Sequence, residues 1–239
     1  MKESIYTIPV NEAFEAYESE EKLCPFCRLY KKLQENELDL ILGASMMDPD
    51  IRIKTNKTGF CSKHYGDMLK KGNRLSLALM LESHLNEVYD DINAKDILKP
   101  EGTNASKRIN ELNSTCYVCE RIDFSFTKMI ETAVILWKSE PEFRKNTEHQ
   151  PYICLPHFER FLREGKARLG KKEFPIFFKS VKGVTMRYYD ELREDVSWFC
   201  KKFDYRYNDE PWGNAKDSPE RAINFLGSDT EYQVPKNKK

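Results

Sequence analysis

The sequence predicts an all-α protein built from two duplicated helical halves. Apolar residues recur at spacings of three and four over long stretches, as on one face of a helix. No segment keeps up the alternation of apolar and polar residues that half-buried strands show. A pattern of cysteine and histidine pairs also occurs twice along the 239 residues. This length allows one large domain or two small ones, each with a hydrophobic core.

The first half contains two candidate helices. The first runs from Phe26 to Ile41, and Gly43 and Pro49 mark its end. After a connector that extends through residue 60, a longer apolar stripe predicts a second helix over 77–92. The apolar positions of the two helices are Phe26, Leu29, Tyr30, Leu33, Leu40 and Ile41, then Leu77, Met80, Leu81, Leu85, Val88 and Ile92.

The second half repeats this plan. Apolar spacing predicts one helix over 122–137 and a second that is interrupted near 165–170 and resumes over 174–203. Residues 99–115 are rich in Pro, Gly, Asn and Ser, which is typical of a linker. We therefore expect a first repeat at 1–98, a linker at 99–115, a second repeat at 116–203, and a C-terminal loop, short helix and tail at 204–239.

Six of the seven cysteines belong to a repeated motif, Cys-x-x-Cys followed by Cys-x-x-His. The offset between copies is 92 residues for the first pair (24 to 116) and 93 for the second (61 to 154). Between the pairs, Asp48-Pro49-Asp50 recurs as Glu140-Pro141-Glu142, which we interpret as an acidic turn. Several features recurring at nearly one offset indicate an internal duplication. The motif residues are Cys24, Cys27, Cys61 and His64, then Cys116, Cys119, Cys154 and His157.

Three thiolates and one imidazole form a donor set that is typical of a closed tetrahedral zinc site. Soft sulfur donors argue against magnesium and calcium. A helix of about 20 residues rises roughly 30 Å, and an extended connector of about 14 residues spans some 45 Å, so the chain can return to its starting end. We therefore expect two zinc ions, each ligated within its own half. An iron-sulfur cluster, which accepts histidine as well as cysteine, and metal-free buried thiols remain the alternatives.

Charge and terminal sequence bear on location and partners. Lysine plus arginine and aspartate plus glutamate number 39 each, so no overall field attracts nucleic acid or an anionic membrane. Residues 1–10 lack a signal-peptide pattern, and no stretch approaches eighteen uninterrupted apolar residues. We expect a cytoplasmic protein without a membrane partner, in a reducing compartment that disfavours disulfides.

Several segments resemble a known family. They are 49–52, 59–61, 73–81, 203–206 and 211–214. Together with the duplicated cysteine and histidine motifs, they resemble a bacterial family of unknown function that occurs mainly in anaerobic Gram-positive bacteria. The resemblance covers nearly the whole chain. Some members carry an automatic label as transporter substrate-binding proteins, which we discount because the start of this chain has no signal or lipid-attachment cysteine. The resemblance implies no established activity.

Three other single residues are candidates for a functional role. His84 lies in the apolar stripe of 77–92, where a hydrogen-bonded core histidine is favoured over a catalytic or ligand role. Cys200 follows Phe199 and is expected to be a small core residue. Trp212 lies in a tight loop, where it either binds a ligand or packs onto the helices.

A basic segment at 160–187 is the best candidate for a phosphate or nucleic-acid contact. It includes Lys171 and Lys172, and basic residues outnumber acidic ones in it. A solvated helix face is favoured, because no aromatic residues for base stacking are interleaved on its polar side.

These observations allow three functional hypotheses. The leading one is a non-enzymatic module with structural metals that binds an unknown protein or small-molecule ligand. The second is an enzyme with a pocket between the halves that uses His84 and acids of the connectors. The third is a nucleic-acid binder that uses the basic segment.

Overall fold

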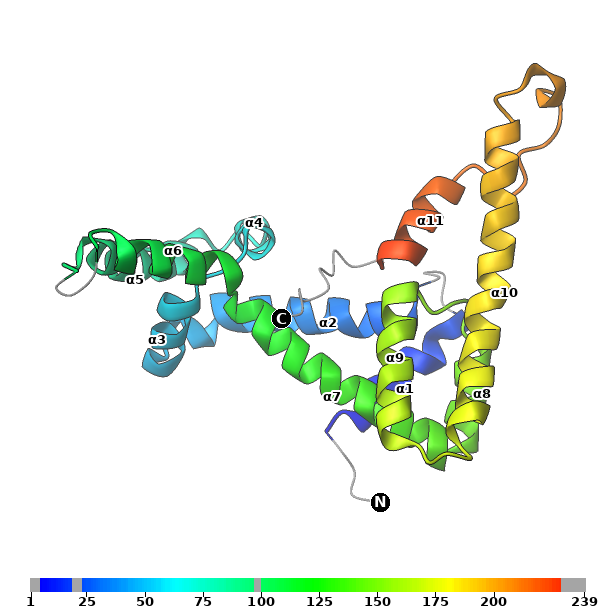
Figure 1. Cartoon of the computed structure of the whole chain (residues 1–239), viewed down its shortest axis with the longest axis horizontal. Helices are drawn as coiled ribbons and strands as arrows, with labels where there is room; N and C mark the ends of the chain where they lie inside the picture. The colour runs from blue at the N-terminus through cyan, green and yellow to red at the C-terminus, as the bar shows by residue number, and fades with distance from the viewer. Residues whose placement is uncertain (1–4, 19–22, 97–99, 229–239) are drawn as a thin grey trace. The chain divides into compact units, whose positions relative to one another are not determined.

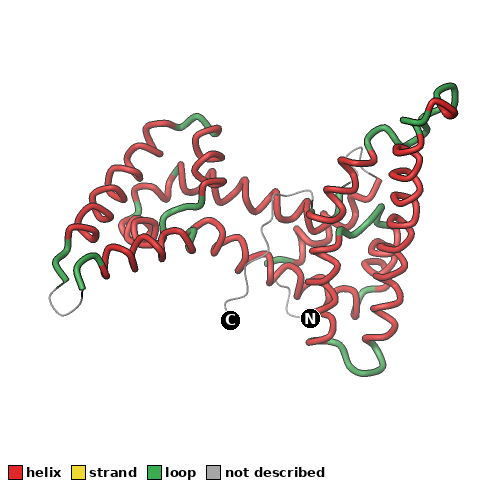
Figure 2. Tube along the Cα trace, turned by 45° about the horizontal axis from the view of Figure 1, so that its top comes forward, coloured by secondary structure: helices red, strands yellow, loops and turns green. Residues whose placement is uncertain are grey.

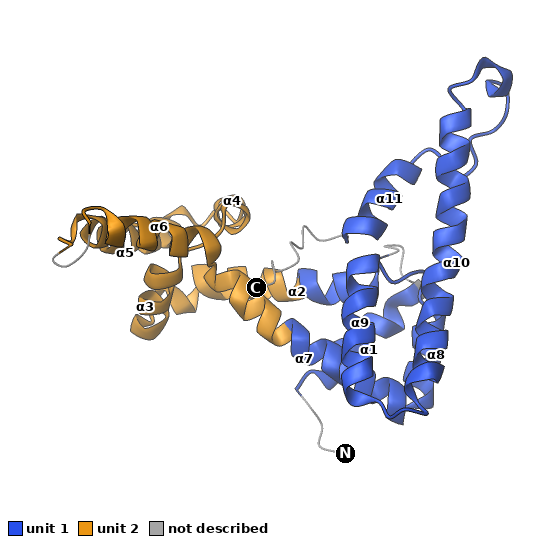
Figure 3. Cartoon of the chain, viewed as in Figure 1, with its two compact units in different colours: residues 1–31, 126–239 blue, residues 32–125 orange. Residues whose placement is uncertain are grey.

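The computed structural model describes residues 5–18, 23–96 and 100–228 (Figure 1). Within these ranges all regular elements are helical and none is a strand, which confirms the all-α prediction (Figure 2). The chain divides into two compact units: unit 1 comprises residues 1–31 and 126–239, and unit 2 comprises residues 32–125 (Figure 3). The boundaries fall inside two long helices, α2 (Pro25–Leu42) and α7 (Tyr117–Ser139). The units therefore do not coincide with the expected repeats at 1–98 and 116–203.

Unit 2 combines the later part of α2 and the start of α7 with four complete α-helices. The apolar stripe predicted over 77–92 lies within α5. The first Cys-x-x-His motif, Cys61 to His64, does not open this helix. It opens a separate short helix, α4, which comes between the connector and α5. The complete elements are η2 (Ala44–Met47), α3 (Pro49–Thr58), α4 (Ser62–Lys70), α5 (Arg74–Asn93) and α6 (Thr103–Ser114).

The acidic turn around Pro49 starts a helix. The Asp48 carboxylate accepts hydrogen bonds from the backbone N–H groups of Asp50 and Ile51, at 2.9 and 3.3 Å, and Pro49 occupies the first turn. This is a strong N-terminal signal, because the cap satisfies donors that have no partner in the helix and proline needs none. Most of the connector that we expected to be extended is therefore helical.

Most of the segment expected to be a linker, 99–115, is helical, because 103–114 form α6. The proline and glycine that suggested a linker, Pro100 and Gly102, precede the helix, and Gly102 takes a left-handed backbone conformation (φ 84°) just before it. Arg108 then fastens α6 by donating to the Asp91 carboxylate at 2.6 Å and to the backbone carbonyls of Asn56 and Lys57. Tertiary contacts outweigh the weak helix propensity of a segment rich in Asn and Ser.

Unit 1 contains the start of α2, the later part of α7 and five complete α-helices. The interruption predicted near 165–170 lies at 169–173, between α9 and α10, so Gly165 is still helical. Of the expected C-terminal segment, 229–239 lie outside the described residues. The complete elements are α1 (Thr7–Glu15), η1 (Ala16–Glu18), α8 (Pro141–His149), α9 (Leu155–Arg168), α10 (Phe174–Lys201), η3 (Tyr205–Tyr207) and α11 (Ser218–Gly227).

The core of unit 1 is a chain of fully buried phenylalanine rings from different helices. Phe26 of α2 contacts Phe14 of α1 with ring centroids 5.3 Å apart and Phe161 of α9 at 4.9 Å. Phe161 in turn contacts Phe177 of α10 at 4.8 Å. All three contacts are edge-to-face, which is the geometry that aromatic quadrupoles favour. These rings hold the starts of α2 and α9 in one core.

Gly165 allows the close approach of α9 and α10, and we expect Gly165→Ala to destabilise the protein by about 1–3 kcal/mol. A methyl group at this position would overlap the buried Phe177 ring. Gly183→Ala is the matched control, because Gly183 is an exposed residue inside α10 with open space around its α-carbon. Alanine there should stabilise by about 0.5–1 kcal/mol through its higher helix propensity. Urea unfolding of both variants measures the difference, and equal midpoints would contradict this packing.

Candidate metal centres

The structure collects the eight residues of the duplicated motif into two clusters, each within one unit. In both clusters, one ligand atom from every residue lies within 4.8 Å of the others. The first centre lies in unit 1 and consists of Cys24, Cys27, Cys154 and His157. The second centre lies in unit 2 and consists of Cys61, His64, Cys116 and Cys119.

The prediction that each half closes its own site is therefore wrong. Each centre takes its Cys-x-x-Cys pair from one half and its Cys-x-x-His pair from the other. The return path explains the difference: 18 residues of α2 rise about 27 Å, whereas the ten residues of α3, wound into a helix, span only about 15 Å. A largely helical connector of this length is too short to bring Cys61 back to the start of α2.

All four pairs lie at helix starts. Cys24 and Cys27 bracket the first turn of α2, and Cys116 and Cys119 do the same for α7. In the other two pairs, Cys61 and Cys154 are the N-caps of α4 and α9, and the histidine follows three residues later, on the same helical face. The unpaired N–H groups and the dipole of a helix start favour negative thiolates.

The first centre is compact around the His157 ring. The distances from its Nδ1 atom to the Sγ atoms are 3.1 Å for Cys154, 3.3 Å for Cys27 and 3.7 Å for Cys24. The Sγ atoms of Cys27 and Cys154 are 3.7 Å apart. The side chains of all four residues are fully buried.

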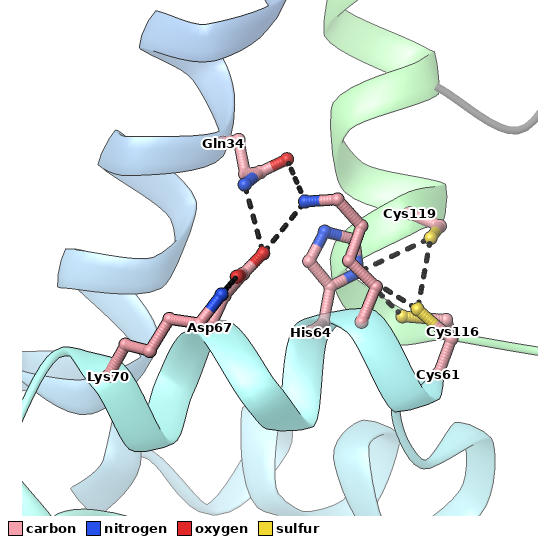
Figure 4. Close-up of polar contacts among 8 residues, drawn as sticks. Gln34, Cys61, His64, Asp67, Lys70, Cys116 and Cys119 are labelled. Carbon is pink, nitrogen blue, oxygen red and sulfur yellow. Dashed lines mark hydrogen bonds and ion pairs between the residues drawn. The ribbon is translucent and has the colours of Figure 1, made fainter. Parts of the chain in front are cut away.

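The second centre has nearly the same geometry (Figure 4). The Nδ1 atom of His64 lies 3.3 Å from the Sγ atoms of both Cys61 and Cys116 and 3.4 Å from that of Cys119. The Sγ atoms of Cys61 and Cys119 are 3.9 Å apart. His64 and Cys116 are buried, whereas Cys61 and Cys119 are half-buried.

These separations fit a single tetrahedral ion. Zn–S bonds of about 2.3 Å and Zn–N bonds of about 2.0 Å place tetrahedral ligand atoms about 3.8 Å apart for two sulfurs and about 3.5 Å apart for sulfur and nitrogen. The observed distances, 3.7–3.9 Å and 3.1–3.7 Å, bracket these values. A disulfide would need about 2.05 Å, and all seven cysteines are free thiols. Both clusters can therefore hold a metal ion.

Within each cluster, the closely spaced cysteines shift one another's pKa values in opposite directions. In the second centre, hydrogen bonds with Cys116 and Cys119 hold the pKa of Cys61 far below its usual range, and hydrogen bonds with Cys116 and Cys61 raise the pKa of Cys119. Burial lowers the pKa of His64, but its hydrogen bonds with Cys116 and Cys61 outweigh burial and raise it to about 9. In the first centre, burial raises the pKa of Cys27 and Cys154.

We expect zinc binding at the second centre to release protons at pH 7. His64, with a pKa of about 9, and Cys119, with a raised pKa, hold protons below those values, and a bound cation must displace both. Zinc affinity should therefore rise with pH, and the His64 contribution should level off above pH 9. Calorimetric titration of the metal-free protein in two buffers of different ionisation enthalpy counts these protons. Proton-neutral binding at pH 7 would contradict the assignment.

A polar network fastens α4 to α2 beside the second centre (Figure 4). Lys63 donates to the Asp67 carboxylate at 2.7 Å and to the side-chain carbonyl of Gln34 at 3.0 Å, and the Gln34 amide donates to Asp67 at 3.2 Å. Although partial burial opposes it, the bonds with Lys63 and Lys70 lower the pKa of Asp67. Sequence reasoning missed Gln34 and Asp67, because neither belongs to a motif.

The other single-residue candidates are each engaged in the fold or exposed. His84 is buried, and its Nδ1 atom lies 2.8 Å from the backbone oxygen of Asn56. Trp212 packs against Phe199 with ring centroids 5.7 Å apart. The prediction of a core Cys200 is wrong: this residue is exposed, because the side chains that α10 buries end at Leu192, about two turns before it.

Most arginines of the basic segment at 160–187 contact other parts of unit 1. Arg160 is buried and donates to the Thr127 hydroxyl at 2.8 Å. Arg168 pairs with Glu131 at 2.7 Å and also with Glu164, and Arg163 pairs with Glu159 at 3.0 Å. Lys171 and Lys172 are exposed in the turn between α9 and α10. Acidic residues inside and outside the segment therefore offset part of its positive charge.

Comparison with known proteins identifies a family and no activity. No curated protein and no solved structure matches the chain. None of the described helices is both long and apolar enough to cross a membrane. A family model matches residues 1–233, which confirms the resemblance to an uncharacterised family. The chain belongs to DUF6062, a family of unknown function.

Proposed function

We propose that the protein is a zinc-stabilised helical module in which each centre holds one structural Zn²⁺ ion. The observation that carries this proposal is the convergence of three sulfurs and one imidazole nitrogen, at tetrahedral spacing, in two separate places. Four protein ligands leave no open position for a substrate. Closed sites of this kind support a fold, so we propose a role in binding a partner protein or small ligand without catalysis.

The donor set also supports zinc over other metals. Sulfur-rich sites select zinc or iron-sulfur chemistry over magnesium and calcium. Ligand atoms within 4.8 Å of one another suit a single ion, whereas a cluster of several iron and sulfide atoms needs a wider cage. Zinc has no redox chemistry and accepts tetrahedral geometry without strain, which suits ions that join helix starts.

Metal analysis tests this proposal directly. The full chain is purified without oxygen and without added metal, and its zinc and iron are counted by elemental analysis. We expect two zinc ions per chain and a colourless protein. Cobalt substituted for zinc should show the visible absorption of a tetrahedral thiolate site with two equivalents bound. Fewer than one metal ion per chain, or a brown protein that contains iron, would contradict the proposal.

Removal of the metal tests its structural role. Each ion joins segments far apart in sequence: Cys27 to Cys154, 127 residues apart, and Cys61 to Cys119, 58 residues apart. We expect a chelator to lower the melting temperature and added zinc to restore it, because binding that requires the folded site stabilises the fold. An unchanged melting temperature after proven metal loss would contradict a structural role.

A further inference from the structure

The two centres share their donor set and differ in exposure. In the first centre, the exposed fraction of Cys24, Cys27, Cys154 and His157 is 0%. In the second centre, His64 and Cys116 are 1% and 5% exposed, whereas Cys61 and Cys119 are half-buried. Two cysteines of the second centre are therefore partly open to solvent, and none of the first is.

The helices that carry the histidines also differ in how firmly they pack. In the first centre, α9 buries Arg160, Phe161 and Gly165 beside His157, and the His157 ring lies 5.1 Å from that of Phe126. In the second centre, α4 buries only Met68 besides His64. Segments with few buried contacts open at low free-energy cost. Besides these two residues, α4 is attached to α2 through the part-buried polar network of Lys63, Gln34 and Asp67.

From these two differences we propose that Cys61 and Cys119 are a site of oxidative modification, where a peroxide forms a disulfide and releases the metal of the second centre. This inference rests on the proposed zinc binding. The first centre, whose ligand residues are fully buried, should resist the peroxide and serves as the control within the same chain. Cys61 and Cys119 are the two partly exposed cysteines of the second centre, and their Sγ atoms are 3.9 Å apart.

The reaction balances with a peroxide as oxidant. One thiolate attacks the peroxide, the O–O bond breaks, and a sulfenic acid forms with loss of one water. The second thiolate then attacks the sulfenic sulfur, the S–S bond forms, and a second water leaves. In total, two thiolates, one hydrogen peroxide and two protons give one disulfide and two waters. The two sulfurs supply the two electrons, and Zn²⁺ is released without change of oxidation state.

The geometry supports this sequence. Cys61 is the N-cap of α4 and Cys119 lies in the first turn of α7, so both sulfurs lie at helix starts, where the helix dipole favours the thiolate form. A disulfide requires this sulfur separation to close from 3.9 Å to about 2.05 Å, and α4, which buries only His64 and Met68, carries one of the two sulfurs. Only Cys116 and His64 then remain as ligands, and two ligands do not complete a tetrahedral site.

The test uses the zinc-loaded full chain with Cys200→Ser, because Cys200 is an exposed thiol outside both centres. Graded hydrogen peroxide is added, released zinc is measured with a metal-sensitive dye, and bound zinc is counted by native mass spectrometry. The remaining thiols are then alkylated after unfolding with a chelator. Peptide mapping identifies which cysteines are protected as disulfides.

We expect loss of one zinc ion of two, a disulfide between Cys61 and Cys119, and alkylation of Cys24, Cys27 and Cys154. A thiol reductant with added zinc should restore the second ion. Simultaneous loss of both ions, earlier oxidation of the first centre, or no loss at peroxide levels that oxidise Cys200 in the parent chain would overturn the inference. A chain that binds no zinc before oxidation would instead refute the proposed function.

Discussion

Cys154→Ser is expected to leave one zinc ion per chain and to remove most of the stability of unit 1. A hydroxyl replaces one thiolate, and the buried thiolates of Cys24 and Cys27 lose their cation in a fully buried site. Structural zinc binding amounts to about 10–16 kcal/mol in small peptides, and whole domains are stable by only about 5–15 kcal/mol. Even a fraction of the zinc contribution is therefore a large share of the total. Thermal melts and zinc content measure both effects.

Cys200→Ser is the matched control for this variant. It makes the same substitution in unit 1 at an exposed cysteine outside both centres. It should retain two zinc ions, and its stability should change by no more than about 0.5 kcal/mol, as is usual for a surface substitution. Equal melting of both variants, despite proven metal loss in Cys154→Ser, would overturn the structural role and favour the enzyme hypothesis.

Cys61→Ser is expected to release the ion of the second centre and leave that of the first centre in place. The variant tests which ligands share a centre, because the cysteines that lose their metal ion are those that bind the same ion as Cys61. With the observed pairing, Cys116 and Cys119 become reactive towards an alkylating reagent in the folded protein. If each half closed its own site, Cys24 and Cys27 would become reactive instead. Mass spectrometry of the alkylated peptides distinguishes the two outcomes.

The loss of stability in Cys61→Ser should be smaller than that in Cys154→Ser. Only His64 and Met68 of α4 are buried, so α4 can detach while α3, α5 and α6 keep their contacts. Hydrogen exchange should show fast exchange confined to 62–70 and to the start of α7. Protection of α4 equal to that in the parent chain would contradict a metal-dependent attachment of this helix.

The ligand residues and the long helices could be predicted from the sequence because both depend on local spacing. The interval of three residues in each motif and the apolar stripe of α5 are visible without knowledge of the fold. The separate helix α4 was missed because its end is marked by a local cap: Asn73 starts α5 by accepting a hydrogen bond from the backbone N–H of Ser76. This signal is weaker than the apolar stripe that follows it.

The pairing of the motifs could not be predicted, because it depends on the path of the chain between them. The Asp48-Pro49 signal for a helix start was present, but we interpreted it as a turn. The reach of the connector was therefore overestimated, because it was calculated for an extended chain. The linker was misassigned for a related reason. Composition reflects only the local preferences of a segment. The helix is stabilised by contacts from elsewhere in the chain, because Arg108 joins α6 to α5 and to backbone carbonyls of α3.

The crossed arrangement of the ligands has a consequence for the chain as it leaves the ribosome. The second centre has all its ligands once Cys119 has emerged, whereas the first centre needs residues up to His157. Cys27 precedes Cys154 by 127 residues, and at about 5–20 residues per second this separation corresponds to roughly 6–25 s of translation. During this interval the thiols of Cys24 and Cys27 lack their partners. Translation thus sets an order of assembly in which the more exposed centre is complete before the buried one.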